Sequence, residues 1–309
     1  MKTLISTVIA IVFSVSLMAQ SSANLSLNLD MNKTYKIKST TEQNTTVTFG
    51  GAPQQSVTSS YSFLSLKPVS NGKDFIVAEL RFDTIATKVS MPKMDMNSTK
   101  PGNIKSTDPS EVVGCILNRL SSQTFNVKLA LTGNVIEISN LKAIIDNVLK
   151  DVDSIQGQAA PMLKAQIGMM ISENALKGMI EAITAYLPGK KVSVGESWNS
   201  RITISAGGLG MLIDNNYKLK KINGTQAEVS AEATIEPASQ APMDMGGAQI
   251  TYDVRGLGKT TLIIDTKTGW IVKATSKSHN QGNMNIKAQG NDMQMPMETD
   301  GTTEIVAVP

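Results

Sequence analysis

The chain has one cysteine, Cys115, and one histidine, His279, among its 309 residues. A single cysteine cannot form an intramolecular disulfide, so the fold depends on a packed core, for which the chain is long enough. Any Ser-His-Asp, Cys-His or histidine-based metal site would have to use His279. Its polar neighbours include no base-orienting carboxylate, so we interpret it as an exposed histidine, and we interpret Cys115, which has apolar neighbours, as a buried small hydrophobe.

Aromatic residues make up only 4% of the chain, and the formal net charge is +3. Few aromatic rings leave few platforms for stacking on bases or sugars, and the dispersed Lys and Arg residues form no basic patch. We therefore expect no nucleic-acid partner. The acidic residues are scattered singly and no nucleotide-binding motif is present, so we predict no catalytic residues, no cofactor and no enzymatic activity. A hydrolase stays open as an alternative, because carboxylate pairs assemble in space rather than in sequence. It is the least favoured one, because sugar-binding clefts need aromatic platforms and this chain has few.

The N-terminus has one positive charge, at Lys2, followed by the apolar run Leu4 to Met18. This run is too short for a stable membrane anchor, and small residues follow it. The pattern predicts a cleavable signal peptide over residues 1–23, with cleavage after Ala19 or Ala23. No later run is apolar enough to span a bilayer. We expect a periplasmic or secreted protein with no transmembrane anchor.

Residues 139–187 differ from the rest of the chain because their apolar residues recur at helical spacing. Three stripes can be read, each with charged residues between its members: Leu141, Ile144, Ile145, Val148, Leu149 and Val152; Met162, Leu163, Ile167, Met170 and Ile171; and Leu176, Met179, Ile180, Ile183 and Leu187. The flanking residues, 24–138 and 188–309, alternate apolar and polar residues as strands do. We predict an N-terminal β unit, a helical insert and a C-terminal β unit.

The alternation of apolar and polar residues also predicts one β-bulge, and recurring short motifs suggest one internal repeat. The apolar parity of 76–82 shifts by one residue before Ile85, which indicates a bulge near Asp83 and Thr84. The tripeptide Met-Asp-Met occurs at 94–96 and again at 243–245, among other cues in the same order. These favour two copies of one β unit, although turn chemistry shared by all β-meanders explains them as well. The fold class is then α+β, mainly antiparallel β, as an open or half barrel of two similar β units with the helical insert packed on the sheet.

Small and flexible side chains that are expected to face inward would leave room for an apolar or lipid-like ligand between sheet and helices. The candidates are Met169, Met170, Met179, Ala231 and Ala233. The alternative is that they fill a close-packed core. The Gly-rich segment 255–259 opens no helix after a strand, so we predict a loop or bulge there rather than a phosphate site.

A copper or metal-handling protein is the alternative function. Thioethers at i and i+2 of an extended chain point to the same side, and soft sulfur ligands select Cu(I). The candidate ligands are Met94, Met96, Met243, Met245, Met293 and Met295. Methionine also fills irregular apolar surface without any metal, which gives a structural explanation of the same clusters.

Two motifs carry a resemblance to a known family. Val194-Gly195-Glu196-Ser197-Trp198 and Asp265-Thr266-Lys267-Thr268-Gly269-Trp270-Ile271 resemble segments of a family of exported bacterial proteins of unknown function. This resemblance covers most of the mature chain and brings no catalytic residues with it. The predicted architecture is also similar to the lipoprotein-carrier half-barrel, in which helices cover an apolar concave face.

Overall fold

The computed structural model describes residues 21–91, 93–157, 160–206, 209–245, 248–288 and 291–309. The predicted signal peptide therefore lies almost wholly outside the described residues. The helices are α1 (Pro109–Ser121), α2 (Leu141–Val148), α3 (Ala160–Met170) and α4 (Glu173–Thr184), with a 3-10 turn η1 (Val152–Ser154). Helices α2 to α4 and η1 fall within the predicted helical insert. The side chains of Asp108 and Ser172 accept hydrogen bonds from the first turns of α1 and α4.

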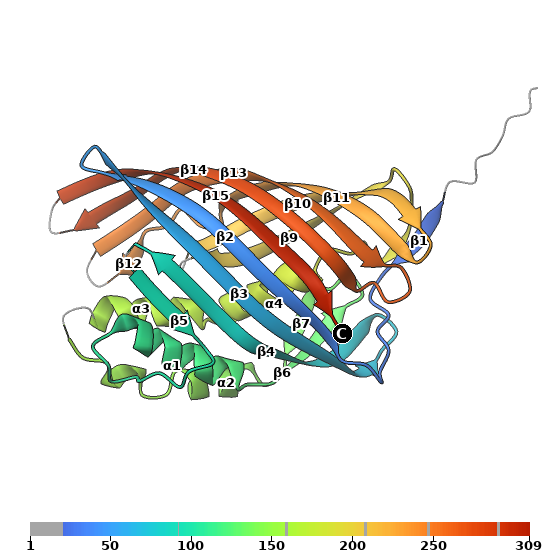
Figure 1. Cartoon of the computed structure of the whole chain (residues 1–309), viewed down its shortest axis with the longest axis horizontal. Helices are drawn as coiled ribbons and strands as arrows, with labels where there is room; N and C mark the ends of the chain where they lie inside the picture. Colours follow the sequence, from blue (N-terminus) through green and yellow to red (C-terminus); the bar gives the residue numbers. More distant parts are fainter. Residues whose placement is uncertain (1–20, 92, 158–159, 207–208, 246–247, 289–290) are drawn as a thin grey trace, which may run out of the picture.

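One large antiparallel sheet of thirteen strands dominates the described part of the chain (Figure 1). Its strands are β2 (Tyr35–Phe49), β3 (Ala52–Asn71), β4 (Phe75–Ser90), β5 (Lys93–Asn97), β6 (Phe125–Ala130), β7 (Val135–Ile138), β9 (Ser197–Ala206), β10 (Leu209–Asn223), β11 (Gln226–Pro237), β12 (Met243–Met245), β13 (Ala248–Asp265), β14 (Ile271–Ala288) and β15 (Asn291–Val308). The order β7-β6-β4-β3-β2-β15-β14-β13-β11-β10-β9 leaves the sheet open, with β7 and β9 at its ends.

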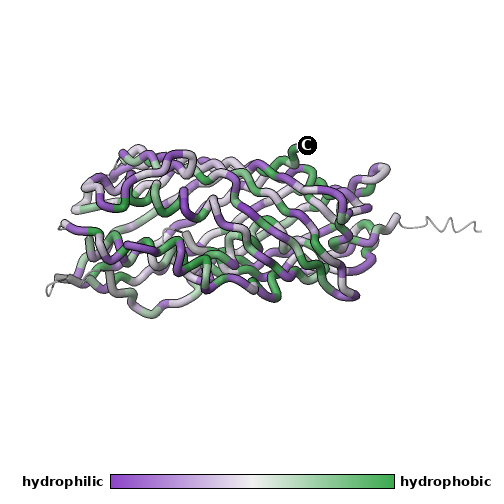
Figure 2. The backbone as a smooth tube through the Cα atoms, turned by 90° about the horizontal axis from the view of Figure 1, so that it is seen from below, coloured by the Kyte–Doolittle hydropathy of each residue, from purple (hydrophilic) through white to green (hydrophobic). Residues whose placement is uncertain are grey.

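Within this large sheet, the two predicted β units join where β2 pairs with β15, and we call this pairing the seam. From this seam each unit runs outward as a meander, and each Met-Asp-Met segment forms a short side strand, β5 on β4 and β12 on β13. The prediction of a mainly antiparallel open sheet with an inserted set of helices is confirmed. Figure 2 shows the alternation of hydrophilic and hydrophobic residues along the strands that made this prediction possible.

One end of the curved sheet is closed by the N-terminal segment, and we call it the base. Strand β1 (Ser22–Leu25) pairs with β8 (Lys190–Ser193), and the chain then crosses the base, with Leu25, Leu27 and Leu29 at most 2% exposed. The amide of Leu27 donates to the carbonyl of Leu131 (2.9 Å), and that of Asn28 to the carbonyl of Thr268 (2.9 Å). These bonds tie the β6–β7 turn to the β13–β14 turn, which belongs to the other half of the strand order.

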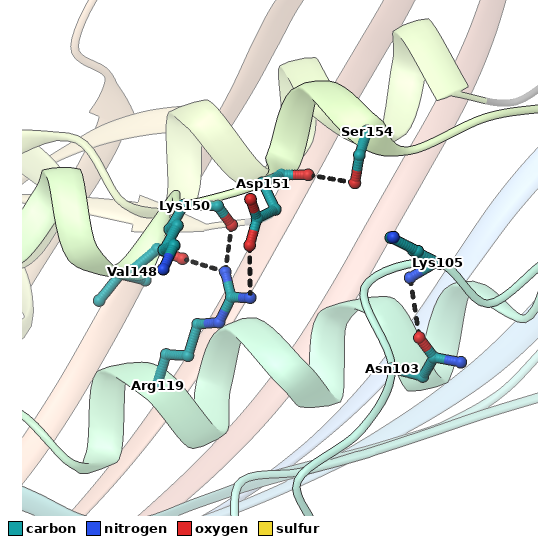
Figure 3. Close-up of polar contacts among 7 residues, drawn as sticks. All are labelled: Asn103, Lys105, Arg119, Val148, Lys150, Asp151 and Ser154. Carbon is teal, nitrogen blue, oxygen red and sulfur yellow. Dashed lines mark hydrogen bonds and ion pairs between the residues drawn. The ribbon is translucent and has the colours of Figure 1, made fainter.

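Helices α1 to α3 form a layer along the side that the sheet leaves open (Figure 1). Arg119 holds this layer together, because its guanidinium on α1 donates to the carbonyls of Val148 (3.3 Å) and Lys150 after α2 and pairs with Asp151 (3.7 Å) (Figure 3). These carbonyls end a helix and have no intrahelical partner, so a cation there is favourable.

Helix α4 spans the gap between the two end strands. On the β7 side, the buried carboxylate of Glu181 accepts a hydrogen bond from the amide of Val135 (2.9 Å), and the hydroxyl of Thr184 donates to the carbonyl of Gly133 (2.6 Å). On the β9 side, the side chains of Trp198 and Ser200 donate to the carbonyls that follow α4. The helix thus pairs polar groups at both ends of the sheet, where unpaired strand edges would otherwise remain.

The register confirms one local prediction and corrects another. Phe63 pairs with Thr84 and Leu64 with Phe82, so Asp83 is the extra residue of a bulge, as the parity shift predicts. The loop or bulge predicted at 255–259 is wrong, because these residues lie inside β13 and pair regularly with β11 and β14. The glycines there serve close strand contact instead: a Cβ at Gly256 would lie 2.5 Å from the carbonyl oxygen of His279.

Candidate functional site

The inner face of the sheet is the one that carries the core residues Ile37, Leu64 and Leu262. Strand pairing places a continuous row of hydroxyls on this face, one step further from the base. In order across β4, β3, β2, β15, β14 and β13 the row is Thr87, Ser60, Thr41, Thr303, Ser276 and Thr260. These hydroxyls pair as Ser60–Thr87 (3.1 Å), Thr41–Thr303 (2.9 Å) and Thr260–Ser276 (2.9 Å). Pairing satisfies each hydroxyl within the wall of the sheet.

On four neighbouring strands, β15, β14, β13 and β11, the next row of the inner face has almost no side-chain volume. It consists of Gly301, Ser278, Gly258 and Ala233, and Gln43 on β2 lies across the seam from Gly301. The helices make their main strand contacts elsewhere: α1 on β4 and β5, α4 on β9 and β7, and α3 on β12. The middle of the inner wall therefore has small side chains that the helices do not pack against.

Beyond this row, toward the end of the sheet opposite the base, the inner face becomes apolar again. Four of its residues are buried and yet lie outside the main core cluster: Ile202, Met211, Val254 and Met295. Around them stand inward-facing apolar residues that are only half-buried, namely Val47, Ile213, Ile235, Ile250, Tyr252, Met284, Ile286 and Met297. We call these twelve residues the distal apolar wall. Half-exposed apolar side chains on a concave face are what a site for an apolar ligand requires.

Charge separates the two faces of the sheet. At the described inward positions of β2, β3, β11, β13, β14 and β15 there is no Asp, Glu, Lys or Arg, whereas the outward positions carry many. Burial on the inner side raises the pKa of Tyr252 above its ordinary value, because the phenolate loses hydration there. The inner wall is therefore suited to contact with an uncharged molecule and unsuited to contact with an ionic one.

The predicted ligand-binding residues divide between the core and the inner wall. Ala231 is 3% exposed within the core cluster and continues the hydroxyl row, whereas Ala233 lies in the small-residue row and is half-buried. Met170 and Met179 are half-buried and pack against the core, and Met169 is half-buried on α3. Sequence reasoning missed the distal apolar wall, because its members come from seven strands that only pairing aligns.

The methionine clusters are not gathered by strand pairing. Met293 and Met295 face inward on β15, and Met243 lies in the same row as Met293, with β13 and β14 between them. Met94 and Met96 lie on β5, which β4, β3 and β2 separate from β15. The side chain of Met245 lies outside the described residues. A copper site thus stays a prediction of the sequence, and the positions of these side chains suit an apolar lining.

His279 is exposed as predicted, but the expectation that no carboxylate orients it is wrong. Its Nδ1 lies 2.9 Å from Oδ1 of Asp300, the residue directly opposite on β15. This hydrogen bond raises the pKa of His279 above its ordinary value. The two residues are 21 positions apart in the sequence, so sequence reasoning did not pair them.

A family model matches residues 74–271, which include both motifs that carry the resemblance noted above. The chain belongs to the DUF6263 family of unknown function. The prediction of a family of unknown function is confirmed for this DUF6263 protein. No curated protein matches its sequence. Among the residues that the structure describes, no helix has both the length and the apolar character needed to cross a membrane.

Solved structures resemble the DUF6263 protein only distantly. A structure of lipid–protein interactions in lipovitellin covers 91% of this chain and 26% of its own, at 8% identity and a TM-score of 0.48. The match to an outer membrane channel from Pseudomonas putida F1 covers 91% of this chain and 97% of the channel, at 8% identity and a TM-score of 0.26. The match to the translocator domain of the autotransporter NalP from Neisseria meningitidis covers 91% of this chain and 90% of that domain, at 6% identity and a TM-score of 0.23.

Proposed function

We propose that this protein is a non-enzymatic binding protein for an apolar or lipid-like molecule, which it holds against the inner face of its curved sheet. The observation that carries the proposal is the uncharged inner wall, whose distal part exposes apolar side chains outside the main core. Covering such side chains with an apolar ligand is worth about 25 cal/mol per Å² removed from water.

The composition of the wall indicates the class of ligand. Methionines, which have unbranched and flexible side chains, adapt to chains of different shape, and three of them (Met284, Met295 and Met297) lie together at one end. The hydroxyl row lies between this end and the base, and a hydroxyl can accept further hydrogen bonds while paired. A single-chain amphiphile with an uncharged polar end fits this arrangement, with its apolar chain on the distal apolar wall and its polar end at the hydroxyl row.

The test uses adjacent residues of β14 that face opposite sides, Met284 inward and Asn285 outward. A dansyl-labelled long-chain fatty alcohol is titrated into the full mature chain and followed by its fluorescence. Met284→Lys places a charge in the distal apolar wall, so we expect its affinity to fall at least about tenfold. Asn285→Lys adds the same charge on the outer face and should bind as the unmodified protein does.

Two results would contradict the proposal: no saturable binding by the unmodified protein, or equal affinities for the two lysine variants. Circular dichroism of both variants guards against a folding defect. Native mass spectrometry of protein purified from its own envelope provides an independent measurement, and it should show a lipid-sized adduct on the unmodified chain that is lost in Met284→Lys.

A further inference from the structure

The outer face of β14 and β15 carries a mixed cluster of three possible metal ligands. His279 and Asp300 are directly opposite each other across the two strands, and Glu298 precedes Asp300 by two residues, which places it on the same face. The Nδ1 of His279 lies 2.9 Å from an oxygen of Asp300 and 3.9 Å from one of Glu298, and all three ligand atoms lie within 4.8 Å of one another.

These separations are close to those of a coordination shell. Zinc binds imidazole nitrogen and carboxylate oxygen at roughly 2.0–2.2 Å, so two ligands at a tetrahedral angle are about 3.4 Å apart. The two measured distances from Nδ1 bracket that value. The ligands are also fixed by long paired strands, so small rotamer changes would be enough to complete the site.

The surroundings leave coordination positions open. The side chains of His279, Glu298 and Asp300 are 49%, 57% and 64% exposed, so an ion can reach them. A groove of about 700 Å³ begins at Glu298 and continues along Gln281, Arg255 and Asp253 on the same outer face. A second, smaller hollow of about 210 Å³ includes Asp300. The cluster thus lies between two concave surfaces, and a bound ion would keep positions for water or a further ligand.

We propose that His279, Glu298 and Asp300 bind one divalent transition-metal ion, for which Zn²⁺ is the best match. One imidazole with two carboxylates is a borderline donor set that suits Zn²⁺ better than the harder Mg²⁺ or Ca²⁺, which prefer oxygen ligands alone. The site is separate from the inner wall, since it lies on the opposite face of the sheet. It uses no methionine and is therefore also distinct from the copper hypothesis.

The experiment uses the full mature chain without a polyhistidine tag. Because His279 is the only histidine, its imidazole gives one set of signals in a ¹H–¹⁵N spectrum, with no overlap. Zn²⁺ is titrated calorimetrically and in this spectrum. We expect one equivalent to bind and to shift the imidazole signals, and we expect His279→Ala and Asp300→Asn each to weaken binding by at least about tenfold.

Glu304→Gln is the matched control, because Glu304 is an exposed carboxylate on the same face of β15 outside the cluster. It should leave Zn²⁺ affinity unchanged. Saturable Zn²⁺ binding that leaves the imidazole signals in place, or that survives His279→Ala, would refute the site, and so would the lack of saturable binding. All of these substitutions are at exposed positions, so the variants should fold.

Discussion

The carboxylate of Glu181, only 8% exposed on α4, accepts a hydrogen bond from the backbone amide of Val135, the first residue of β7 (2.9 Å). Val135 belongs to the strand at one end of the sheet, and α4 packs on β9 at the other end. This single contact therefore helps to close a sheet that strand pairing leaves open. Lys177, one turn earlier, lies 3.9 Å from the same carboxylate and offsets part of its charge.

Glu181→Ala should destabilise the protein by about 1–3 kcal/mol, because it leaves a buried amide without its acceptor. Glu181→Gln keeps an acceptor oxygen and should cost less. Urea unfolding followed by circular dichroism measures both. Asn174→Ala, at an exposed position of the same helix, is the control and should change the unfolding free energy little. Equal effects of Glu181→Ala and Asn174→Ala would show that the contact with β7 does not support the fold.

Replacing each of two helical glycines with alanine should change the stability of the protein in opposite directions. A Cβ at Gly178 would lie 2.2 Å from the carbonyl oxygen of Thr203 on β9, so Gly178→Ala must push α4 away and cost about 1–3 kcal/mol. Gly168 on α3 has open space at the same position, so Gly168→Ala should stabilise the protein by roughly 0.5–1 kcal/mol through helix propensity. Thermal unfolding of the pair measures this, and two shifts of the same sign would contradict the packing of α4.

Because Tyr186 is buried, we expect the protein to lose stability at alkaline pH. The hydroxyl of Tyr186 donates to the carbonyl of Gly269 (2.9 Å), and burial raises its pKa far above the ordinary value of about 10. The raised pKa means that the unfolded chain ionises first, so stability is full below about pH 10 and falls as pH rises above it. Tyr186→Phe should lose roughly 1 kcal/mol at neutral pH and show a shallower alkaline decline.

Urea unfolding at about pH 8 and about pH 10.5, on either side of the ordinary tyrosine pKa, measures that decline. Tyr217 is also buried with a raised pKa, so the decline should be reduced rather than abolished in Tyr186→Phe. Identical declines in the variant and the unmodified protein would show that Tyr186 is not responsible.

Strand β1 distinguishes the two predicted cleavage sites. Ser22 and Ala23 pair with Ser193 and Val192 on β8, and the carbonyl of Ser21 accepts from the amide of Val194 (2.8 Å). Cleavage after Ala23 would remove these pairs, whereas cleavage after Ala19 keeps them. If the predicted signal peptide is cleaved, we expect the mature chain to begin at Gln20, and intact-mass measurement of the purified protein tests this. A mature chain that begins at Asn24 would contradict this expectation.

The sequence by itself determined the local structure. Helical spacing identified α2 to α4, and a one-residue change of parity located the bulge at Asp83. These features depend on residues within a few positions of one another, where backbone geometry links spacing directly to structure. Burial of Cys115 likewise followed from its apolar neighbours.

Only the tertiary structure decided which distant residues meet. The pairing of His279 with Asp300 and the alignment of hydroxyls from six strands depend on strand register, and the contact of Glu181 with β7 depends on the packing of α4. The glycines at 255–259 misled the sequence analysis for the same reason, since their role is close contact with neighbouring strands rather than a turn. Register depends on the geometry of the turns and on burying one whole face of the sheet at once, so the spacing of residues within one strand does not specify it.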